Sequence, residues 1–343
     1  MMITTTKVGQ FGDESLLCFT LQNAHGHSVD ILNRGAKILA IRVPDQQGTI
    51  ENVVLAFDDL SEYQDDPHHL GATIGRVGGR IANGAFALEG MTYVLEQNEG
   101  EHHLHGGSEN WANRMFTHEI NENDLILRLD SPSGENGYPG HLSFTLTFKW
   151  TDEDVLQIHY EAETTASTPF SPTNHTYFNL TGEAKTTVEQ HILQMDAPFY
   201  VPLTKDAVPT GDILPVAGTV FDFSEARPLH EVTHAPDEEL RQAGSGVDHP
   251  FLLREGGEIV LDEPISGRRL RVVTDQPGVV VYTANHLSGD FTICGRRATP
   301  YLGICFETQG LPDAINQPNF PSVVLHAGER YHKHTSFHFQ VMS

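Results

Sequence analysis

The chain has 343 residues, and its 46 acidic and 21 basic side chains give a formal net charge of -25. Because such an excess of negative charge repels phosphate backbones and anionic lipid surfaces, the composition argues against nucleic acid and membrane partners. Hydrophobic residues make up 38% and charged residues 20% of the chain. The sequence can therefore bury a large core and is unlike a disordered protein.

Short runs that alternate polar and apolar residues predict strands along the whole chain. The clearest is 143–150, and similar runs lie at 16–22, 125–129, 156–160, 269–273 and 278–282. Clusters of Gly, Pro, Asn and Asp, such as 131–140, separate these runs, and the chain contains 31 glycines and 19 prolines. This pattern is typical of an all-β sandwich with many hairpins.

Helical periodicity is scarce. Residues 236–243 predict one short helix, with Asp and Glu in its first turn. No repeat, low-complexity tract or linker divides the sequence. We therefore predict one large antiparallel β-sandwich domain over residues 1–343.

The three cysteines, Cys18, Cys294 and Cys305, are an odd number without C-x-x-C spacing. They predict a reducing compartment, with neither a disulfide framework nor a thiolate zinc site. The N-terminus lacks a basic region followed by an apolar stretch, and no segment approaches transmembrane length. We expect a cytoplasmic protein, and the sequence makes no prediction about its oligomeric state.

Residues 230–234, His-Glu-Val-Thr-His, match the zinc-peptidase pattern H-E-x-x-H. That pattern binds zinc only on a helix, where both histidines share one face. Pro228, two β-branched residues and Pro236 disfavour such a helix here, so we interpret the match as chance. The pairs His68-His69 and His102-His103 are expected by chance among 20 histidines and are interpreted as surface or hydrogen-bonded side chains.

An apolar run at 301–306 near the C-terminus ends on Glu307. The run predicts a buried strand, and Gly310 and Pro312 turn the chain away after it. Glu307 is therefore expected where a core strand opens into a site. Partial desolvation would raise its pKa and make it a usable general base. From this segment alone, a strand-end carboxylate in water or in a salt bridge is an equal alternative.

Three polar segments add candidate ligand-binding residues. Glycines around Arg80 and His105, in 75–84 and 104–107, would let backbone approach a ligand, with surface hairpin turns as the alternative. His175 lies among hydrogen-bonding side chains and could give or take a proton, with a satisfied core histidine as the alternative. Asp248 precedes an apolar strand start, and a turn or cap carboxylate is its alternative.

Six ordered segments, taken together, closely resemble the signature segments of the aldose 1-epimerases, the galactose mutarotase family. The resemblance extends from about residue 25 to the end of the chain. The segments are GRVGGRIANG (75–84), LHGG (104–107), TNHTYFNL (173–180), GVDHPF (246–251), VYTANHLSG (281–289) and ETQGLPDAINQPNFP (307–321).

The resemblance implies a large antiparallel β-supersandwich that interconverts the α- and β-anomers of a free aldose without a metal or organic cofactor. It places the catalytic base on Glu307, the catalytic acid on His175, and substrate-binding side chains on His105, Arg80 and Asp248. In such a reaction the base takes the proton of the C1 hydroxyl while the acid protonates the ring oxygen. We expect a nearby carboxylate to favour the protonated form of His175.

Two positions depart from the family pattern. Gly79 stands where members commonly carry Asn, and Val280 stands where they commonly carry a sugar-contacting Gln. Both changes remove hydrogen-bonding capacity, so the preference among aldoses is expected to differ.

Two other functions compete with mutarotation. A non-catalytic sugar-binding module on the same fold would not require both Glu307 and His175. A glycoside hydrolase would need two carboxylates at a defined separation, here Glu307 and Asp313. Asp313 is equally well explained as a turn residue after Pro312.

Overall fold

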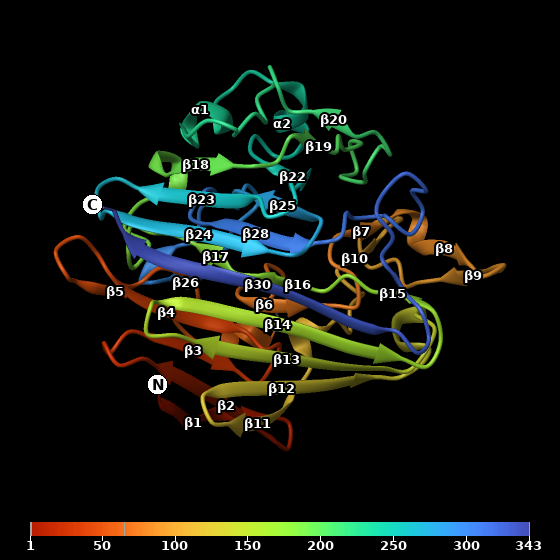
Figure 1. Ribbon diagram of the computed structural model, residues 1–343, viewed down its shortest axis with the longest axis horizontal. Helices are drawn as coiled ribbons and strands as arrows, with labels where there is room; N and C mark the ends of the chain where they lie inside the picture. The colour runs from red at the N-terminus through yellow and green to blue at the C-terminus, as the bar shows by residue number, and fades with distance from the viewer. Residues whose placement is uncertain (1, 65, 343) are drawn as a thin grey trace.

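The structure is a computed structural model that describes residues 2–64 and 66–342 and is built mainly from antiparallel strands (Figure 1). Its largest sheet has nine strands. Their order is β11 (Thr117–Asn121), β12 (Asp124–Ser131), β13 (Leu142–Trp150), β14 (Val155–Thr164), β30 (Arg330–Val341), β24 (Arg268–Thr274), β23 (Glu258–Glu263), β18 (Ile192–Met195) and β21 (Arg227–Pro228).

Two further sheets lie against this one. The first has five strands in chain order, β1 (Met2–Phe11), β2 (Glu14–Gln22), β3 (Ser28–Leu32), β4 (Ile38–Pro44) and β5 (Ile50–Asn52). The second has six strands in the order β17 (Tyr177–Phe178), β28 (Ile304–Gln309), β25 (Gly278–Tyr282), β22 (Asp248–Leu252), β19 (Phe199–Tyr200) and β20 (Leu214–Pro215).

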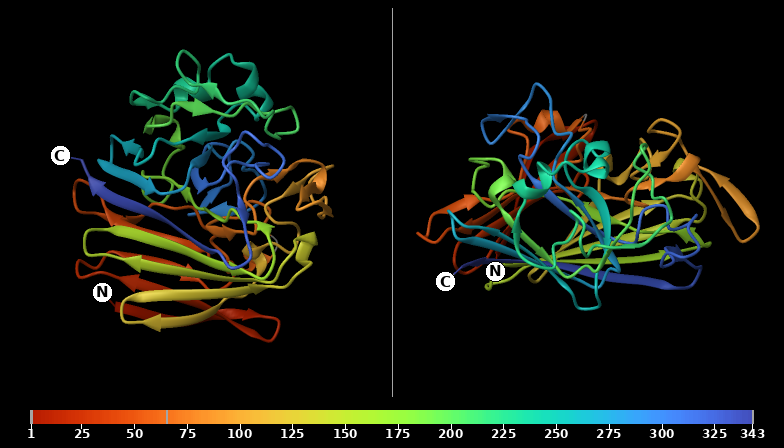
Figure 2. Two further views of the ribbon diagram at one scale, coloured as in Figure 1. Left: turned by 45° about the vertical axis from the view of Figure 1, so that its right-hand side comes forward. Right: turned by 90° about the horizontal axis from the view of Figure 1, so that it is seen from above.

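Short two-stranded ribbons and helical turns complete the described chain. Seen from above, the nine-stranded sheet runs along one side, and the hairpin β8–β9 projects from the rim (Figure 2). The ribbons are β6 (Ala72–Ile74) with β16 (Thr173–His175), β7 (Arg80–Ile81) with β10 (His103–Leu104), β8 (Ala85–Leu88) with β9 (Met91–Val94), β15 (Thr168–Pro169) with β29 (Val324–Leu325), and β26 (Thr292–Ile293) with β27 (Arg296–Arg297). The helices are α1 (His230–Thr233) and α2 (Glu238–Gln242), with 3-10 turns at Leu60–Gln64, Ala82–Gly84, Trp111–Asn113, Glu135–Gly137 and Val188–Gln190.

The three large sheets share one apolar core. Alternate residues of β13 point inward, and Phe144 stacks on Trp111 with ring centroids 4.6 Å apart. The same cluster of buried side chains includes Phe19 of β2 and Phe251 of β22. The all-β sandwich prediction is therefore confirmed, as is each of the six alternating strands. The short helix is also confirmed, since α2 lies within 236–243 with Asp237 as its N-cap.

The strand expected at 301–306 is displaced. Tyr301 has a φ of 62°, which belongs to a turn, and β28 begins at Ile304 and continues to Gln309. The apolar run marks burial, but the ladder with β25 pairs Val280 with Glu307 and Gly278 with Gln309. Glu307 therefore lies inside a buried strand rather than at its end.

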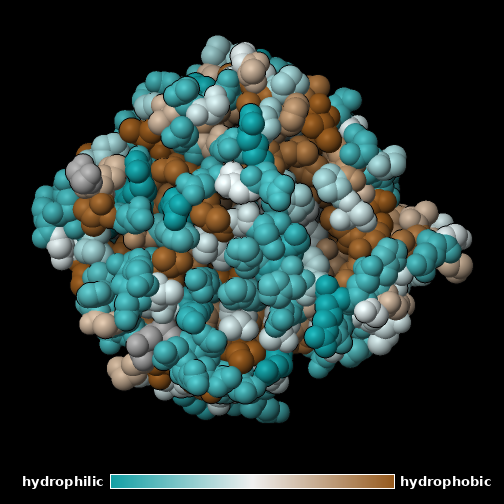
Figure 3. Space-filling view, viewed as in Figure 1, coloured by the Kyte–Doolittle hydropathy of each residue, from teal (hydrophilic) through white to brown (hydrophobic). Residues whose placement is uncertain are grey.

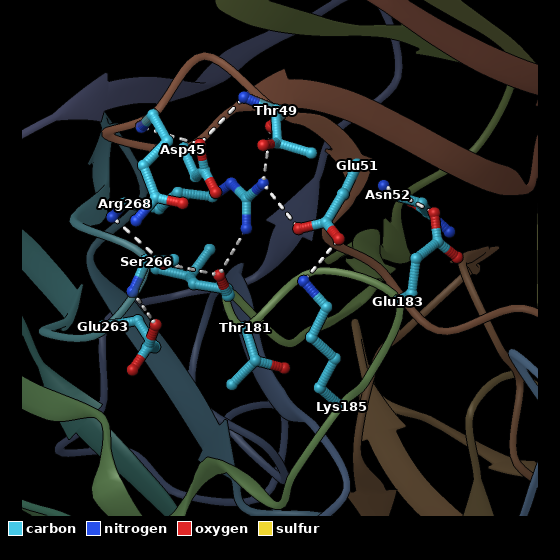
Figure 4. A network of polar contacts seen from close by, with 12 residues as sticks. Asp45, Thr49, Glu51, Asn52, Thr181, Glu183, Lys185, Glu263, Ser266 and Arg268 are labelled. Carbon is cyan, nitrogen blue, oxygen red and sulfur yellow. Dashed lines mark hydrogen bonds and ion pairs between the residues drawn. The ribbon is translucent and has the colours of Figure 1, made fainter.

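A polar network joins Arg268 of β24 to β5 and to the loop before it (Figure 4). The guanidinium of Arg268 is buried and donates to the carbonyls of Leu180 at 3.1 Å and Thr49 at 3.0 Å. It also pairs with Glu51 at 3.0 Å, and Lys185 contacts the other oxygen of that carboxylate. These acceptors offset much of the desolvation of the buried cation, although Nε of Arg268 finds no hydrogen-bond partner among the described residues.

Among residues 2–64 and 66–342, no helix is long and apolar enough to cross a membrane.

Candidate active site

All five residues that the sequence analysis placed in the site line one cavity of about 290 Å³. It is lined by Arg80, His105, His175, Asp248 and Glu307 together with mostly apolar or aromatic neighbours. The volume lies at the lower end for small-molecule sites.

Strand pairing explains why these distant residues meet. In the six-stranded sheet, Asp248 pairs with Tyr282, and Tyr282 pairs with Cys305, two residues before Glu307. Side chains two residues apart on a strand point to the same face. The Asp248 and Glu307 carboxylates therefore project from one face of the sheet into the cavity, from β22 and β28 on either side of β25.

Two ribbons supply the other three side chains. In β7 and β10, Arg80 pairs with Leu104, the residue before His105. In β16 and β6, His175 pairs with Ala72. Arg80 and His175 are thus placed by backbone ladders, and His105 directly follows one.

His175 and Glu307 form a close buried pair. Nε2 of His175 lies 3.6 Å from Oε1 of Glu307, and the two residues are 5% and 3% exposed. Burial raises the pKa of Glu307 well above its usual value, and the negative charge of Asp248 raises it further, while Arg80 opposes the shift. The expected rise in the Glu307 pKa is therefore supported by its environment.

We expected the nearby carboxylate to hold His175 in its protonated form, and this expectation was wrong for the site without a bound ligand. Burial lowers the pKa of His175 to about 3, and the neighbouring His69 lowers it further. The cost of desolvating a protonated imidazole in this cavity exceeds its electrostatic attraction to the Glu307 carboxylate. The transferable proton therefore belongs to the pair, and the neutral arrangement places it on Glu307.

The tautomer of His105 is fixed by the backbone. The N–H of Gly79 donates to Nδ1 of His105 at 3.1 Å, so Nδ1 must carry the lone pair. Burial lowers the pKa of His105 well below its usual value, which keeps the ring neutral. Nε2 then carries the proton, and His105 offers a hydrogen-bond donor to an oxygen in the cavity.

The same geometry bears on metal binding. One ligand atom each from His105, His175 and Glu307 lies within 4.8 Å of the others, close enough for a divalent cation. However, Nδ1 of His105 is occupied by the Gly79 N–H and Nε2 is protonated, so a metal would have to displace a proton or a backbone hydrogen bond. The donor set suits a hydroxylated ligand better than a metal.

Arg80 is oriented by a residue that the sequence analysis missed. Nε and Nη2 of Arg80 donate to the two carboxylate oxygens of Glu99, each at 2.6 Å. Burial alone would lower the pKa of Arg80, but the hydrogen bond with Glu99 and the charge of Asp248 raise it. Such a bidentate pair fixes the plane of the guanidinium.

Asp248 is the second carboxylate of the site. Burial raises its pKa, and the charges of Arg80 and His286 counteract that rise. Its strand neighbour Tyr282 also lines the cavity. Asp248 can accept hydrogen bonds from hydroxyl groups while Arg80 and His105 donate them.

This arrangement can be compared with known proteins. Residues 17–338 match the Aldose 1-epimerase family. The chain belongs to the aldose 1-epimerase family. Human galactose mutarotase is 39% identical over 320 residues, covering 91% of each chain, and Haemophilus influenzae aldose 1-epimerase is 34% identical over 94% of this chain and 95% of its own. A crystal structure of galactose 1-epimerase from Lactobacillus acidophilus superimposes with a TM-score of 0.88 at 27% identity, covering 100% of this chain and 99% of the other.

This aldose 1-epimerase family member carries further histidines in its cavity. His68 and His69, interpreted from the sequence as chance neighbours, both line it, as does His286. The ring of His69 lies 5.2 Å from that of His105 and 6.0 Å from that of His175. Its Nδ1 is buried and finds no hydrogen-bond partner in the described part of the chain. Nothing in the sequence separated His69 from the other histidines.

The two departures from the family pattern both lie at the cavity wall. Gly79 has a φ of 78°, and a Cβ there would lie 2.7 Å from Cγ of Pro312. Val280 pairs with Glu307 on one side and Pro250 on the other, so an apolar strip adjoins the carboxylate. Gly79 is therefore a backbone donor packed against proline, and Val280 contributes to the desolvation of Glu307.

The competing sites are not formed. Asp313 is buried, accepts a hydrogen bond from the N–H of Ala82 at 3.0 Å, and is bound by the amides of Asn316 and Gln317. It is absent from the cavity lining, so the structure does not favour it as a partner of Glu307 in glycoside hydrolysis. In the H-E-x-x-H match, α1 ends at Thr233, so His234 lies beyond the helix, as expected.

Proposed function

We propose that the chain interconverts the α- and β-anomers of a free aldose, with Glu307 and His175 as the acid–base pair. The observation that carries the proposal is the 3.6 Å separation of Nε2 of His175 and Oε1 of Glu307, two residues that line a small cavity. Membership of the aldose 1-epimerase family supports it.

Ring opening requires that the sugar lose one proton, from the C1 hydroxyl, and gain one proton, on the ring oxygen. With the carboxylate ionised and the imidazole protonated, Glu307 takes the proton of the C1 hydroxyl while His175 protonates the ring oxygen. The C1–O5 bond breaks, and the aldehyde rotates about C1–C2. Closure on the other face reverses both transfers, so the pair returns to its starting state.

Burial assists the opening step. The ion pair is opposed by desolvation, whereas the open-chain aldehyde accompanies a neutral pair, with the proton on Glu307. The directions of both pKa shifts favour that neutral pair. The buried cavity therefore favours the state with the open-chain aldehyde and a neutral His175–Glu307 pair over the state with the closed sugar ring and an ionised pair.

The remaining site residues bind and orient the ring. Arg80 and the Nε2–H of His105 donate hydrogen bonds to sugar oxygens, and Asp248 accepts them from hydroxyl groups. Val280 and Gly79 shape the preference among aldoses. Comparison of kcat/KM for glucose, galactose, xylose, arabinose and fucose measures that preference.

Three broader proposals accompany this function. Residues 1–343 form one mutarotase-like domain, a proposal supported by the single core that the three sheets share. The enzyme works in the cytoplasm, which its three free cysteines support. Its partner is a small aldose and not nucleic acid, in keeping with its net charge of -25.

Polarimetry of freshly dissolved α-glucose and the other four aldoses tests the function. Glu307→Gln and His175→Asn should each lower kcat by about 10²–10⁴-fold, the usual contribution of a positioned acid or base. The exposed residues Glu101 and His118 offer matched controls, Glu101→Gln and His118→Asn, which should keep full activity. No acceleration of any of the five aldoses over buffer would overturn the proposal.

A further inference from the structure

A group of histidines lies on the outer face of the nine-stranded sheet, outside the cavity. In the ladder between β14 and β30, His159 pairs with His334 and Glu161 pairs with His332. His332 and His334 are two residues apart, so they share the outward face. Three imidazoles and one carboxylate therefore stand at the corners of a rectangle about 5 by 7 Å.

The side chains already approach one another. The ring centroid of His159 lies 6.1 Å from that of His334 and 6.1 Å from that of His332. A tetrahedral Zn²⁺ bound at about 2.1 Å by two imidazole nitrogens places their ring centres roughly 5 Å apart. Side-chain rotations must shorten both separations and bring His332 and His334 together before all three can bind one ion.

A second carboxylate completes the surroundings. Oδ2 of Asp275 lies 3.4 Å from Nδ1 of His334, and its Oδ1 accepts the backbone N–H of His334 at 2.8 Å. His332, His334 and Asp275 line a surface groove of about 1,100 Å³. Over these strands the surface in view is largely hydrophilic, which leaves the group open to ions (Figure 3).

We propose that His159, His332 and His334, with Glu161 or Asp275 as a fourth ligand, bind a first-row divalent cation of the zinc type. Imidazole with carboxylate is a ligand set that selects Zn²⁺, Cu²⁺ or Ni²⁺ over Mg²⁺ or Ca²⁺. The ion would join β14 to β30 across their ladder. Because the ligands lie outside the sugar cavity, this site is independent of mutarotation.

Calorimetric titration of the full chain with ZnCl₂ tests the proposal. The wild-type protein should bind one equivalent, and His159→Gln or His332→Gln should each weaken binding at least tenfold. The variant with all three histidines replaced by Gln should lose this binding. His338→Gln, on the outward face of the same strand but outside the rectangle, should bind as the wild type does.

Two further measurements separate this site from the cavity. Zinc should raise the Tm of the wild type but not of the triple variant, because a ligand that binds only the folded state stabilises it. Polarimetry should show normal mutarotation in the triple variant, which also verifies its fold. Absence of saturable zinc binding overturns the proposal, as does zinc binding that survives in the triple variant and disappears in His175→Asn.

Discussion

The backbone N–H of Gly79 points at Nδ1 of His105, 3.1 Å away, and this contact decides which nitrogen of His105 faces the sugar cavity. A side chain at residue 79 would act on that contact through Pro312. The position therefore influences the site through backbone geometry as well as through the missing amide side chain.

Gly79→Ala should lower kcat/KM at least tenfold, because a Cβ would lie 2.7 Å from Cγ of Pro312 and displace the donor to His105. The matched control is Gly90→Ala, since Gly90 has a φ of 79° and nothing within 4 Å of a Cβ. Both substitutions carry a left-handed penalty of about 1–2 kcal/mol. Polarimetry should find Gly90→Ala fully active, and equal losses would remove the role assigned to the Pro312 contact.

The pH profile of kcat should show a broad plateau. In the proposed mechanism, activity requires one proton on the His175–Glu307 pair. A second proton is gained only near the lowered pKa of His175, about 3, and the last proton is lost only at the raised pKa of Glu307. The acid limb therefore belongs to His175, and activity falls on the alkaline side as pH rises through the pKa of Glu307. Rates measured across the stable pH range check this, and a narrow bell between ordinary glutamate and histidine pKa values would contradict it.

Glu99→Gln should raise KM about five- to tenfold and leave kcat nearly unchanged. Nε and Nη2 of Arg80 each donate to Glu99 at 2.6 Å, and a neutral amide would loosen that orientation. In the proposed function Arg80 binds hydroxyls that do not react, so the ground state and the transition state should lose equal binding energy. Saturation kinetics measure the split, with Glu101→Gln as the control. A large fall in kcat alone would place Arg80 closer to the reacting atoms.

Val280→Gln should lower the pKa of Glu307, since Val280 is its cross-strand neighbour and an amide donor would stabilise the carboxylate. The alkaline limb of the pH profile should then move to lower pH, and the relative kcat/KM among aldoses should change. Val280→Leu keeps the strip apolar and should leave the limb in place. An unchanged limb in the Gln variant would show that Val280 does not control the desolvation of Glu307.

Arg268→Met should destabilise the fold by about 3–5 kcal/mol, the usual cost of removing one partner from a buried ion pair. The loss leaves the carbonyl of Leu180 without its Arg268 donor. The control Arg330→Met removes an exposed partner of Glu163, which should cost about 0–1 kcal/mol. Urea unfolding measures both values, and similar losses would mean that the Arg268 network adds little.

Local patterns in the sequence predicted much of the sandwich because period-two alternation reports directly on which face of a strand is buried. The run at 301–306 shows where this fails, since every residue in it is apolar and alternation cannot mark where pairing begins. Only the ladder with β25 fixes that register, and it moves Glu307 into the strand.

The site could be predicted only through the resemblance of six segments, because no local rule connects Arg80 with Glu307. The residues that were missed act through contacts between distant segments. Glu99 gains its role only when the turn after β9 meets Arg80, and His69 gains its place only beside His105 and His175. The tautomer of His105 likewise depends on a backbone donor 26 residues away.

Asp313 was considered as a catalytic carboxylate, but it instead holds the strand of Arg80 in place, although the two residues are far apart in the sequence. Its N–H donates to the carbonyl of Arg80 at 2.9 Å, and its Oδ1 accepts the N–H of Ala82 at 3.0 Å. During synthesis, Arg80, His105, His175 and Asp248 all precede both Glu307 and this clasp. A ribosome must therefore add residue 307 before the growing chain has its proposed base, and residue 313 before the Arg80 strand is held in place, so a shorter nascent chain should have no mutarotase activity.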